Sequence, residues 1–267
     1  MWLSGRACPI CDSDEMPRHV LRPTLVLAGI LVTLVLPVRP ALAAPTYARV
    51  LGLGDSVPTG ATCACPNEVT LLGRRLTTAQ GSSVAVTNAA HNGATSQYVL
   101  NQARGSGLGS PAGRVTTITV GANDFNASIV TTSACDEAAC YQQALHDLAA
   151  RSRAAISALL INQHGHLLTS SPIVVTGYWN VFLDGAVGRS RGPAYVRNSD
   201  ALTRATNAVL HSAARFYGVT YADLYAPFKG DGSRDDTTLL GSDGDHPNAA
   251  GHRLIAATEQ RALAGLV

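Results

Sequence analysis

A serine that directly follows the first apolar run of the chain is the leading candidate for catalytic chemistry. Residues 47–53 form a mainly apolar run typical of a strand, and Gly54, Asp55 and Ser56 follow it at once. A serine hydroxyl attacks an ester carbonyl at neutral pH only when a base takes its proton and hydrogen-bond donors stabilise the resulting oxyanion. Because Gly, Asp and Ser are also common turn residues, this triplet is informative only with partners elsewhere in the chain.

His246 is the candidate base for Ser56. It lies in a turn-rich segment, residues 242–248, that leads into the last predicted helix, where a histidine is free to face a site at a sheet edge. Asp243, three residues earlier, can reach round the turn to orient the imidazole and stabilise its charged form. The alternative is an Asx turn and helix cap with an exposed histidine, and only the presence of Ser56 favours the catalytic interpretation.

Two further segments offer donors for an oxyanion. Asn123 follows the apolar run 115–120, and its side-chain amide can donate a hydrogen bond. Gly93 can offer a backbone N–H group without a side chain in the way. Together with the N–H group of Ser56 they make three donors, although each glycine-containing segment alone would equally suit a tight turn.

Short strand-like runs alternate with longer amphipathic stretches, and these elements must position the candidate residues. The sequence predicts strands over residues 47–53, 82–88, 115–120, 173–178 and 219–223, and helices over 67–79, 96–104, 139–163, 198–217 and 249–263. This alternation predicts an α/β protein with a parallel sheet of about five strands, covered by helices on both faces. Ligands of such sheets bind beyond the carboxyl ends of the strands, which is where the candidate residues fall.

The four segments together resemble the SGNH/GDSL hydrolase family, whose sequence blocks carry Ser, Gly, Asn and His. The matching blocks are residues 51–56, 88–96, 121–124 and 243–247. The resemblance implies a flavodoxin-like three-layer α/β/α sandwich and ester hydrolysis through an acyl-enzyme on Ser56, with no metal or cofactor. It also implies His246 as the base, Asp243 as its orienting partner, and an oxyanion hole formed by the N–H groups of Ser56 and Gly93 and the Asn123 side chain.

The N-terminal segment predicts export. Basic residues over 18–22, an apolar run over 24–36 and the small residues 41–43 are typical of a secretory signal peptide with Ala44 as the new N-terminus. A membrane anchor is the alternative, but the apolar run is shorter than the roughly 20 residues that a span needs. We therefore predict an extension and signal peptide over residues 1–43 and one hydrolase domain over 44–267. The product is expected to be secreted and monomeric, without a stable membrane span.

Charge and cysteine content narrow the partners and the compartment. The net charge of +2 indicates no nucleic-acid partner. Four cysteines follow the predicted cleavage site, namely Cys63, Cys65, Cys135 and Cys140, and an even number in an exported chain predicts disulfides. Three connectivities are possible: a Cys135–Cys140 loop is ordinary, a Cys63–Cys65 bridge would be strained, and cross-pairing stays open.

Two competing motifs are weaker. Residues 188–192 fit the G-x-S-x-G nucleophile pattern around Ser190, but this segment does not join a strand to a helix, and we expect residues 185–193 to be a loop near the substrate. His164 and His166 follow a long predicted helix and lack the further ligands that a metal site requires.

The substrate stays open at this level. Tyr178, Trp179 and Phe182 follow the fourth predicted strand and can line an acyl or sugar pocket. A lipase, a short-chain esterase and a carbohydrate (acetyl) esterase all fit the same residues, as does an acyltransferase. A non-catalytic glycan-binding module is the alternative from another class, and the complete set of candidate residues argues against it.

Overall fold

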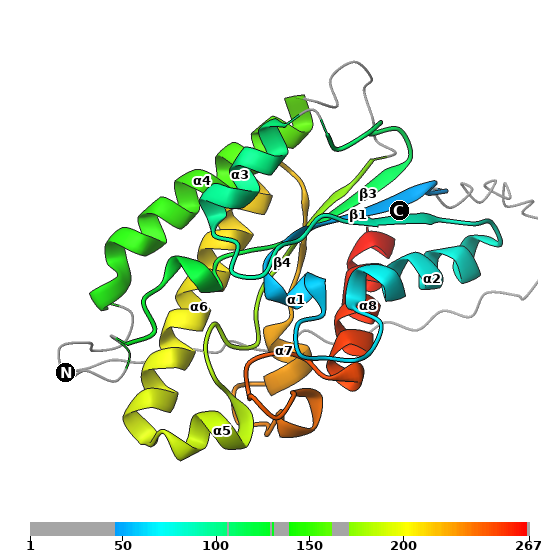
Figure 1. Cartoon of the computed structure of the whole chain (residues 1–267). Helices are drawn as coiled ribbons and strands as arrows, with labels where there is room; N and C mark the ends of the chain where they lie inside the picture. Colours follow the sequence, from blue (N-terminus) through cyan, green and yellow to red (C-terminus); the bar gives the residue numbers. More distant parts are fainter. Residues whose placement is uncertain (1–45, 106, 129, 131–138, 162–170, 266–267) are drawn as a thin grey trace, which may run out of the picture. The chain divides into compact units, whose positions relative to one another are not determined.

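A computed structural model of the chain describes residues 46–105, 107–128, 130, 139–161 and 171–265 (Figure 1). Five parallel strands form a single sheet in the order β2-β1-β3-β4-β5. The strands are β1 (Arg49–Gly54), β2 (Ala85–Asn88), β3 (Arg114–Thr119), β4 (Ile173–Thr176) and β5 (Thr220–Ala222). Each lies at a predicted place, so the predicted parallel sheet is confirmed.

Helices cover both faces of this sheet, which gives three layers. Figure 1 shows α3 (Ser96–Arg104), α4 (Gln142–Ile161) and α6 (Pro193–Phe216) on one side, and α2 (Glu68–Gln80) and α8 (Ala249–Ala264) on the other. Each side has its own cluster of buried apolar side chains, and the larger cluster lies under α3, α4 and α6. The α/β/α architecture is therefore as predicted.

Three short helices complete the described part. They are α1 (Ser56–Thr59), α5 (Gly185–Ser190) and α7 (Tyr225–Lys229). Residues 185–193, predicted as a loop, instead contain α5 and the start of α6. The prediction was wrong because Asp184 caps α5 by accepting from the N–H group of Gly185, and because Pro193, at the start of α6, already has the φ angle that a first helical turn needs.

Polar caps fix where the long helices next to the site begin. Asn67 accepts a hydrogen bond from the N–H group of Thr70 at the start of α2, and Asn248 accepts from Ala250 and Gly251 at the start of α8. Such side chains satisfy N–H groups that have no partner inside the helix. The loops that precede α2 and α8 are thereby held at defined points beside the sheet.

Several predictions lie outside the described residues. They are the signal peptide within residues 1–43, Cys135, and the histidines His164 and His166. In the described ranges, no helix combines the length and the apolar character needed to cross a membrane. The sulfur atoms of Cys63 and Cys65 are joined in the structure, which is one of the pairings that the sequence left open.

Candidate active site

A cavity of about 590 Å³ opens where β1, β3 and β4 end. Its lining combines residues that follow each of these strands with residues from the start of α6 and from the loop before α8. Among them are Ser56, Asn123 and His246, together with the aromatic residues Phe125, Tyr178, Trp179, Phe182 and Tyr195. The cavity has a volume in the range of about 300–1,000 Å³ that is common for small-molecule sites.

A sharp turn holds Ser56 just beyond the carboxyl end of β1. Gly54 has a φ angle of 142°, and a Cβ atom at this position would collide with the carbonyl oxygen of Thr119 on β3. Asp55 then caps α1, because its carboxylate accepts from the N–H group of Val57 at 3.0 Å. Ser56 is the first residue of α1, where a backbone N–H group has no partner within the helix.

Asp55 has a second buried partner that the sequence did not reveal. The Tyr178 hydroxyl donates to Asp55 Oδ2 at 2.5 Å, across 123 residues of sequence. Burial raises the pKa of Asp55 to about 6, even though the hydrogen bonds from Tyr178 and Val57 oppose that rise. The turn that carries Ser56 is thus hydrogen-bonded to the loop that follows β4.

His246 is oriented by Asp243 within one tight turn. The distance from His246 Nδ1 to Asp243 Oδ2 is 2.8 Å, and Asp243 Oδ1 accepts from the backbone N–H groups of Asp245 and His246 at 3.1 Å each. Partial burial alone would raise the pKa of Asp243, but the bonds from the imidazole and from these N–H groups outweigh it and lower the pKa to about 2. Asp243 is therefore ionised near neutral pH.

Asn123 and Gly93 lie on neighbouring loops. Asn123 belongs to a short 3₁₀ helix, Ala122–Asp124, and its Nδ2 atom donates to the carbonyl oxygen of Ala94 at 3.2 Å. Asp124 binds the start of α3, since its carboxylate accepts from the N–H group and the hydroxyl of Ser96 at 2.9 and 2.5 Å. Gly93 has a φ angle of 75°, and a Cβ atom there would meet only open space.

The structure thus brings three of the predicted residues to one cavity. Ser56, Asn123 and His246 line it, Asp243 contacts His246 beside it, and Gly93 is adjacent to the Ala94 carbonyl that Asn123 binds without lining the cavity itself. Within the described part of the chain, Ser56 Oγ forms no hydrogen bond with His246. Catalytic hydrogen bonds commonly shorten only when substrate is present.

The competing serine is placed elsewhere. Ser190 is the last residue of α5, its hydroxyl donates to the carbonyl oxygen of Val187 at 2.7 Å, and it is not part of the cavity lining. The three predicted aromatic residues Tyr178, Trp179 and Phe182 do line the cavity. Trp179 is fixed by stacking on Phe228, with ring centroids 4.5 Å apart.

Sequence reasoning missed several polar residues of the cavity, among them Arg191, Tyr195, Asn180 and Asp245. Arg191 lies between α5 and α6, and Tyr195 is in the first turn of α6, where its hydroxyl accepts a hydrogen bond from the N–H group of Leu183 at 3.0 Å. The only available signal was their place in or next to residues 185–193, the segment predicted to be near the substrate. Both add polar character to an otherwise largely aromatic wall.

Comparisons with known proteins identify the family and the fold. The chain matches the model of the GDSL-like Lipase/Acylhydrolase family over residues 53–254. A search of curated proteins found no match.

Solved structures agree on the fold. The lipase Lip_vut3 from a goat rumen metagenome is 18% identical with a TM-score of 0.61, over 81% of this chain and 97% of the other. A putative GDSL-like lipase from Parabacteroides merdae is 16% identical with a TM-score of 0.56, over 85% and 100%. A catalytic mutant of Axe2, an acetylxylan esterase from Geobacillus stearothermophilus, is 15% identical with a TM-score of 0.57, over 82% and 95%. The chain belongs to the GDSL-like lipase/acylhydrolase family and is a serine ester hydrolase with a three-layer α/β/α fold.

Proposed function

We propose that this family member is a secreted esterase that cleaves carboxylic esters through an acyl-enzyme on Ser56. The observation that carries the proposal is the shared cavity: Ser56, Asn123 and His246 line it, and Asp243 binds the imidazole at 2.8 Å. A nucleophile, a base with its orienting partner and an oxyanion donor are the parts that acyl transfer requires.

The first half of the reaction forms the acyl-enzyme. His246 Nε2 takes the proton of Ser56 Oγ as Oγ attacks the ester carbonyl carbon. The carbonyl oxygen becomes an oxyanion that accepts hydrogen bonds from the N–H groups of Ser56 and Gly93 and from Asn123 Nδ2. When the carbon–oxygen bond to the alcohol breaks, the imidazolium returns the proton to the departing oxygen.

The second half releases the acid. A water molecule gives a proton to His246 and attacks the acyl carbon, and the proton then passes to Ser56 Oγ as the carboxylic acid leaves. Asp243 accepts from Nδ1 throughout and offsets the positive charge on the imidazole. Its lowered pKa of about 2 keeps it ionised for this role.

The cavity supports an ester with a short acyl chain. Its walls are aromatic, its volume is about 590 Å³, and Arg191 and Asn180 supply polar groups for the alcohol part of the substrate. Likeness to an acetylxylan esterase is compatible with an acetylated sugar as that alcohol. We expect acetyl and butyryl esters to be hydrolysed at least roughly tenfold faster than long-chain esters, because a long apolar chain would cover the polar groups of Arg191 and Asn180 and leave them without water. Equal rates on all chain lengths contradict this assignment.

Export rests on the sequence of residues 1–43. N-terminal sequencing of protein recovered from the medium of an expressing culture is expected to begin at Ala44. Retention of the whole chain in the membrane fraction supports the anchor alternative instead.

Labelling with a fluorophosphonate probe, followed by mass mapping of the modified peptide, tests the catalytic assignment. We expect modification at Ser56, loss of labelling in Ser56→Ala and in His246→Ala, and unchanged labelling in the control variant Ser190→Ala. Modification at Ser190, or no modification in a protein that retains esterase activity, excludes Ser56 as the nucleophile.

A further inference from the structure

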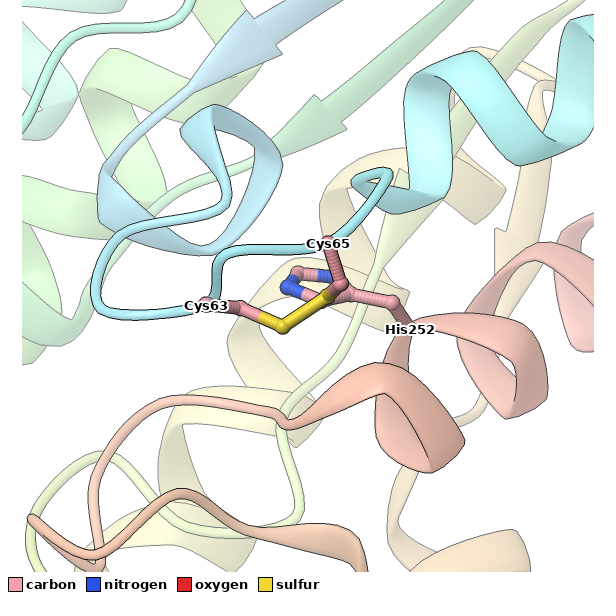
Figure 2. Close-up of side chains that lie close together, drawn as sticks. All are labelled: Cys63, Cys65 and His252. Carbon is pink, nitrogen blue, oxygen red and sulfur yellow. A yellow bond between two sulfur atoms is a disulfide. The ribbon is translucent and has the colours of Figure 1, made fainter.

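A cluster of sulfur and nitrogen atoms lies outside the lining of the catalytic cavity. Cys63 and Cys65 belong to the loop between α1 and α2, and His252 lies in the first turn of α8 behind them (Figure 2). The two sulfur atoms and a nitrogen of His252 are within 4.8 Å of one another. None of the three residues lines the cavity that contains Ser56.

His252 is fully buried, and among the described residues only one of its two ring nitrogens has a hydrogen-bond partner. Its side chain is 0% exposed, and Nδ1 lies 2.6 Å from Glu68 Oε2 at the start of α2. Among the described residues, Nε2 of His252 has no hydrogen-bond partner. A buried polar atom without a partner costs free energy, so a ligand for Nε2 would remove a penalty that the fold now carries.

The contact with Glu68 prepares this nitrogen for a metal ion. When Glu68 is ionised, its carboxylate accepts from Nδ1, and the lone pair of the neutral ring then lies on Nε2. Metal-binding histidines commonly donate their other nitrogen to a carboxylate, which fixes the ring and its tautomer. Glu68 is 0% exposed and thus held firmly in that position.

The donor set indicates which ion would fit. Two thiolates and one imidazole form a borderline-soft set that suits Zn²⁺, with bond lengths of about 2.3 Å to sulfur and about 2.0 Å to nitrogen. Both cysteines are half-buried, so their loop is partly open to solvent, and a water would serve as the fourth ligand. Glu68, which is buried behind His252, would support the site as the outer partner of the histidine.

We propose that the dithiol form of Cys63 and Cys65 binds one Zn²⁺ ion together with Nε2 of His252, with Glu68 as the outer carboxylate. The disulfide seen in the structure and the zinc complex are then two alternative states of the same loop.

The interconversion balances in electrons and protons. A dithiol reductant transfers two electrons and two protons to the Cys63–Cys65 bond and becomes a disulfide itself, which leaves two thiols on the protein. Zinc binding then forms two Zn–S bonds and one Zn–N bond and releases two protons to solvent. In the reverse direction, a small disulfide accepts two electrons from the thiolates and two protons from solvent, becomes a dithiol, and the new Cys63–Cys65 bond expels the ion.

Cobalt(II) titration of the full-length chain tests the proposal, because thiolate-to-cobalt charge transfer reports sulfur ligands directly. Cys8 and Cys11 form a separate C-x-x-C pair, so the titration uses a Cys8→Ser, Cys11→Ser background. After reduction with a phosphine and its removal, we expect one equivalent of cobalt to bind with charge-transfer absorption, and one equivalent of zinc to displace it. The oxidised protein is expected to show no such absorption.

Matched variants assign the ligands. Cys63→Ser and Cys65→Ser are each expected to lose about half of the charge-transfer intensity, whereas Cys140→Ser is expected to keep all of it. Glu68→Gln is expected to weaken zinc binding by about 10–100-fold, the usual cost of removing an outer partner. His252→Gln is expected to lose tight binding, and if circular dichroism shows this variant to be unfolded, the two serine variants and Glu68→Gln decide.

Three results overturn the proposal. They are the absence of stoichiometric cobalt binding in the reduced protein, charge transfer that keeps its full intensity in both serine variants, and unchanged zinc affinity in a folded Glu68→Gln variant. In any of these cases Glu68 and His252 form only a buried pair that packs α2 against α8.

Discussion

His246 Nδ1 lies 2.8 Å from Asp243 Oδ2 and 3.9 Å from Asp245 Oδ2, so two neighbouring carboxylates differ in their contact with one imidazole. Only Asp243 also accepts from backbone N–H groups within the turn. The turn therefore fixes Asp243 as the hydrogen-bond partner of the ring, whereas Asp245 acts on it only through charge.

This difference predicts unequal effects of two isosteric substitutions. Asp243→Asn is expected to lower kcat for a p-nitrophenyl ester by roughly 10²–10⁴-fold, because the amide no longer holds the tautomer or offsets the imidazolium charge. Asp245→Asn is the matched control, and its effect is expected to stay near fivefold, since a solvated charge at about 4 Å contributes only about 1 kcal/mol. Equal losses in the two variants contradict the assignment of Asp243.

Asn123 provides a test of the oxyanion hole. Asn123→Ala is expected to lower kcat by about 10²–10³-fold with little change in KM, because a donor to the oxyanion acts mainly in the transition state. Asn126→Ala is the control, since Asn126 is three residues away and its side chain instead binds Ser128 at 2.8 Å. A large rise in KM with unchanged kcat in Asn123→Ala assigns this residue to substrate binding instead.

Local patterns were sufficient to predict the sheet, the long helices and a set of candidate residues that the structure places in or beside one cavity. The alternation of apolar runs placed all five strands, and the four sequence blocks singled out Ser56 and Asn123 after strands and His246 before the last helix. Gly93 and Asp243 follow from the same blocks, because loops after parallel strands gather at one edge of the sheet. Turn chemistry and helix caps then determine the remaining geometry.

Contacts between distant segments could not be predicted in this way. The bond between Tyr178 and Asp55 joins residues 123 positions apart, and the bond between His252 and Glu68 joins residues 184 apart. No periodicity marks such pairs, since each polar residue stands alone in an otherwise ordinary helix or loop. The position of Arg191 in the cavity likewise depends on how α5 and α6 pack, which the sequence pattern does not encode.

Asp55 predicts a pH dependence of stability. Its folded-state pKa is raised from 3.8 to about 6, mainly by burial, so the folded protein binds the proton more tightly than the unfolded chain does. Between these two values the Asp55 contribution to the free energy of unfolding therefore falls as the pH rises, by up to about 3 kcal/mol in total. Asp55→Asn removes this contribution, while its side-chain oxygen still accepts from Val57.

Urea denaturation of wild type and Asp55→Asn between about pH 3 and pH 7 measures the effect. The variant is expected to gain stability relative to wild type as the pH rises through this window, with a constant difference above it. Other buried carboxyl groups are present in both proteins, so most of their contribution cancels, and the loss of the Asp55 charge lessens the rise in the pKa of Glu68 in the variant. Parallel stability curves across the window contradict the raised pKa of Asp55.

Lys229 is the only lysine of the chain, and it is buried among carboxylates. Its Nζ atom lies 2.6 Å from Asp184 Oδ2 and 3.7 Å from Asp200 Oδ1. Burial and the neighbouring Asp184 raise the pKa of Asp236 to about 7, and the charge of Lys229 opposes that rise. Lys229 thus neutralises a group of acids that links α5, α6 and the loop before the 3₁₀ helix Thr237–Leu239.

Removing the charge of Lys229 is expected to destabilise the fold. Lys229→Met keeps most of the side-chain volume but leaves Asp184 buried without its cation, which is expected to lower the free energy of unfolding by about 3–5 kcal/mol. Arg189→Met is the matched control, because Arg189 pairs with Asp235 at 2.9 Å on the exposed surface, and such pairs contribute only about 0.2–1 kcal/mol. Urea unfolding near neutral pH compares the two variants.

A loss of less than about 1 kcal/mol in Lys229→Met contradicts this role, because a buried carboxylate without a cation destabilises the fold by more than that. The exception is a variant in which the buried acids take up protons and lose their charge. Repeating the measurement near pH 5 separates these cases, since protonation of the acids would reduce the cost there and leave the Arg189 control unchanged.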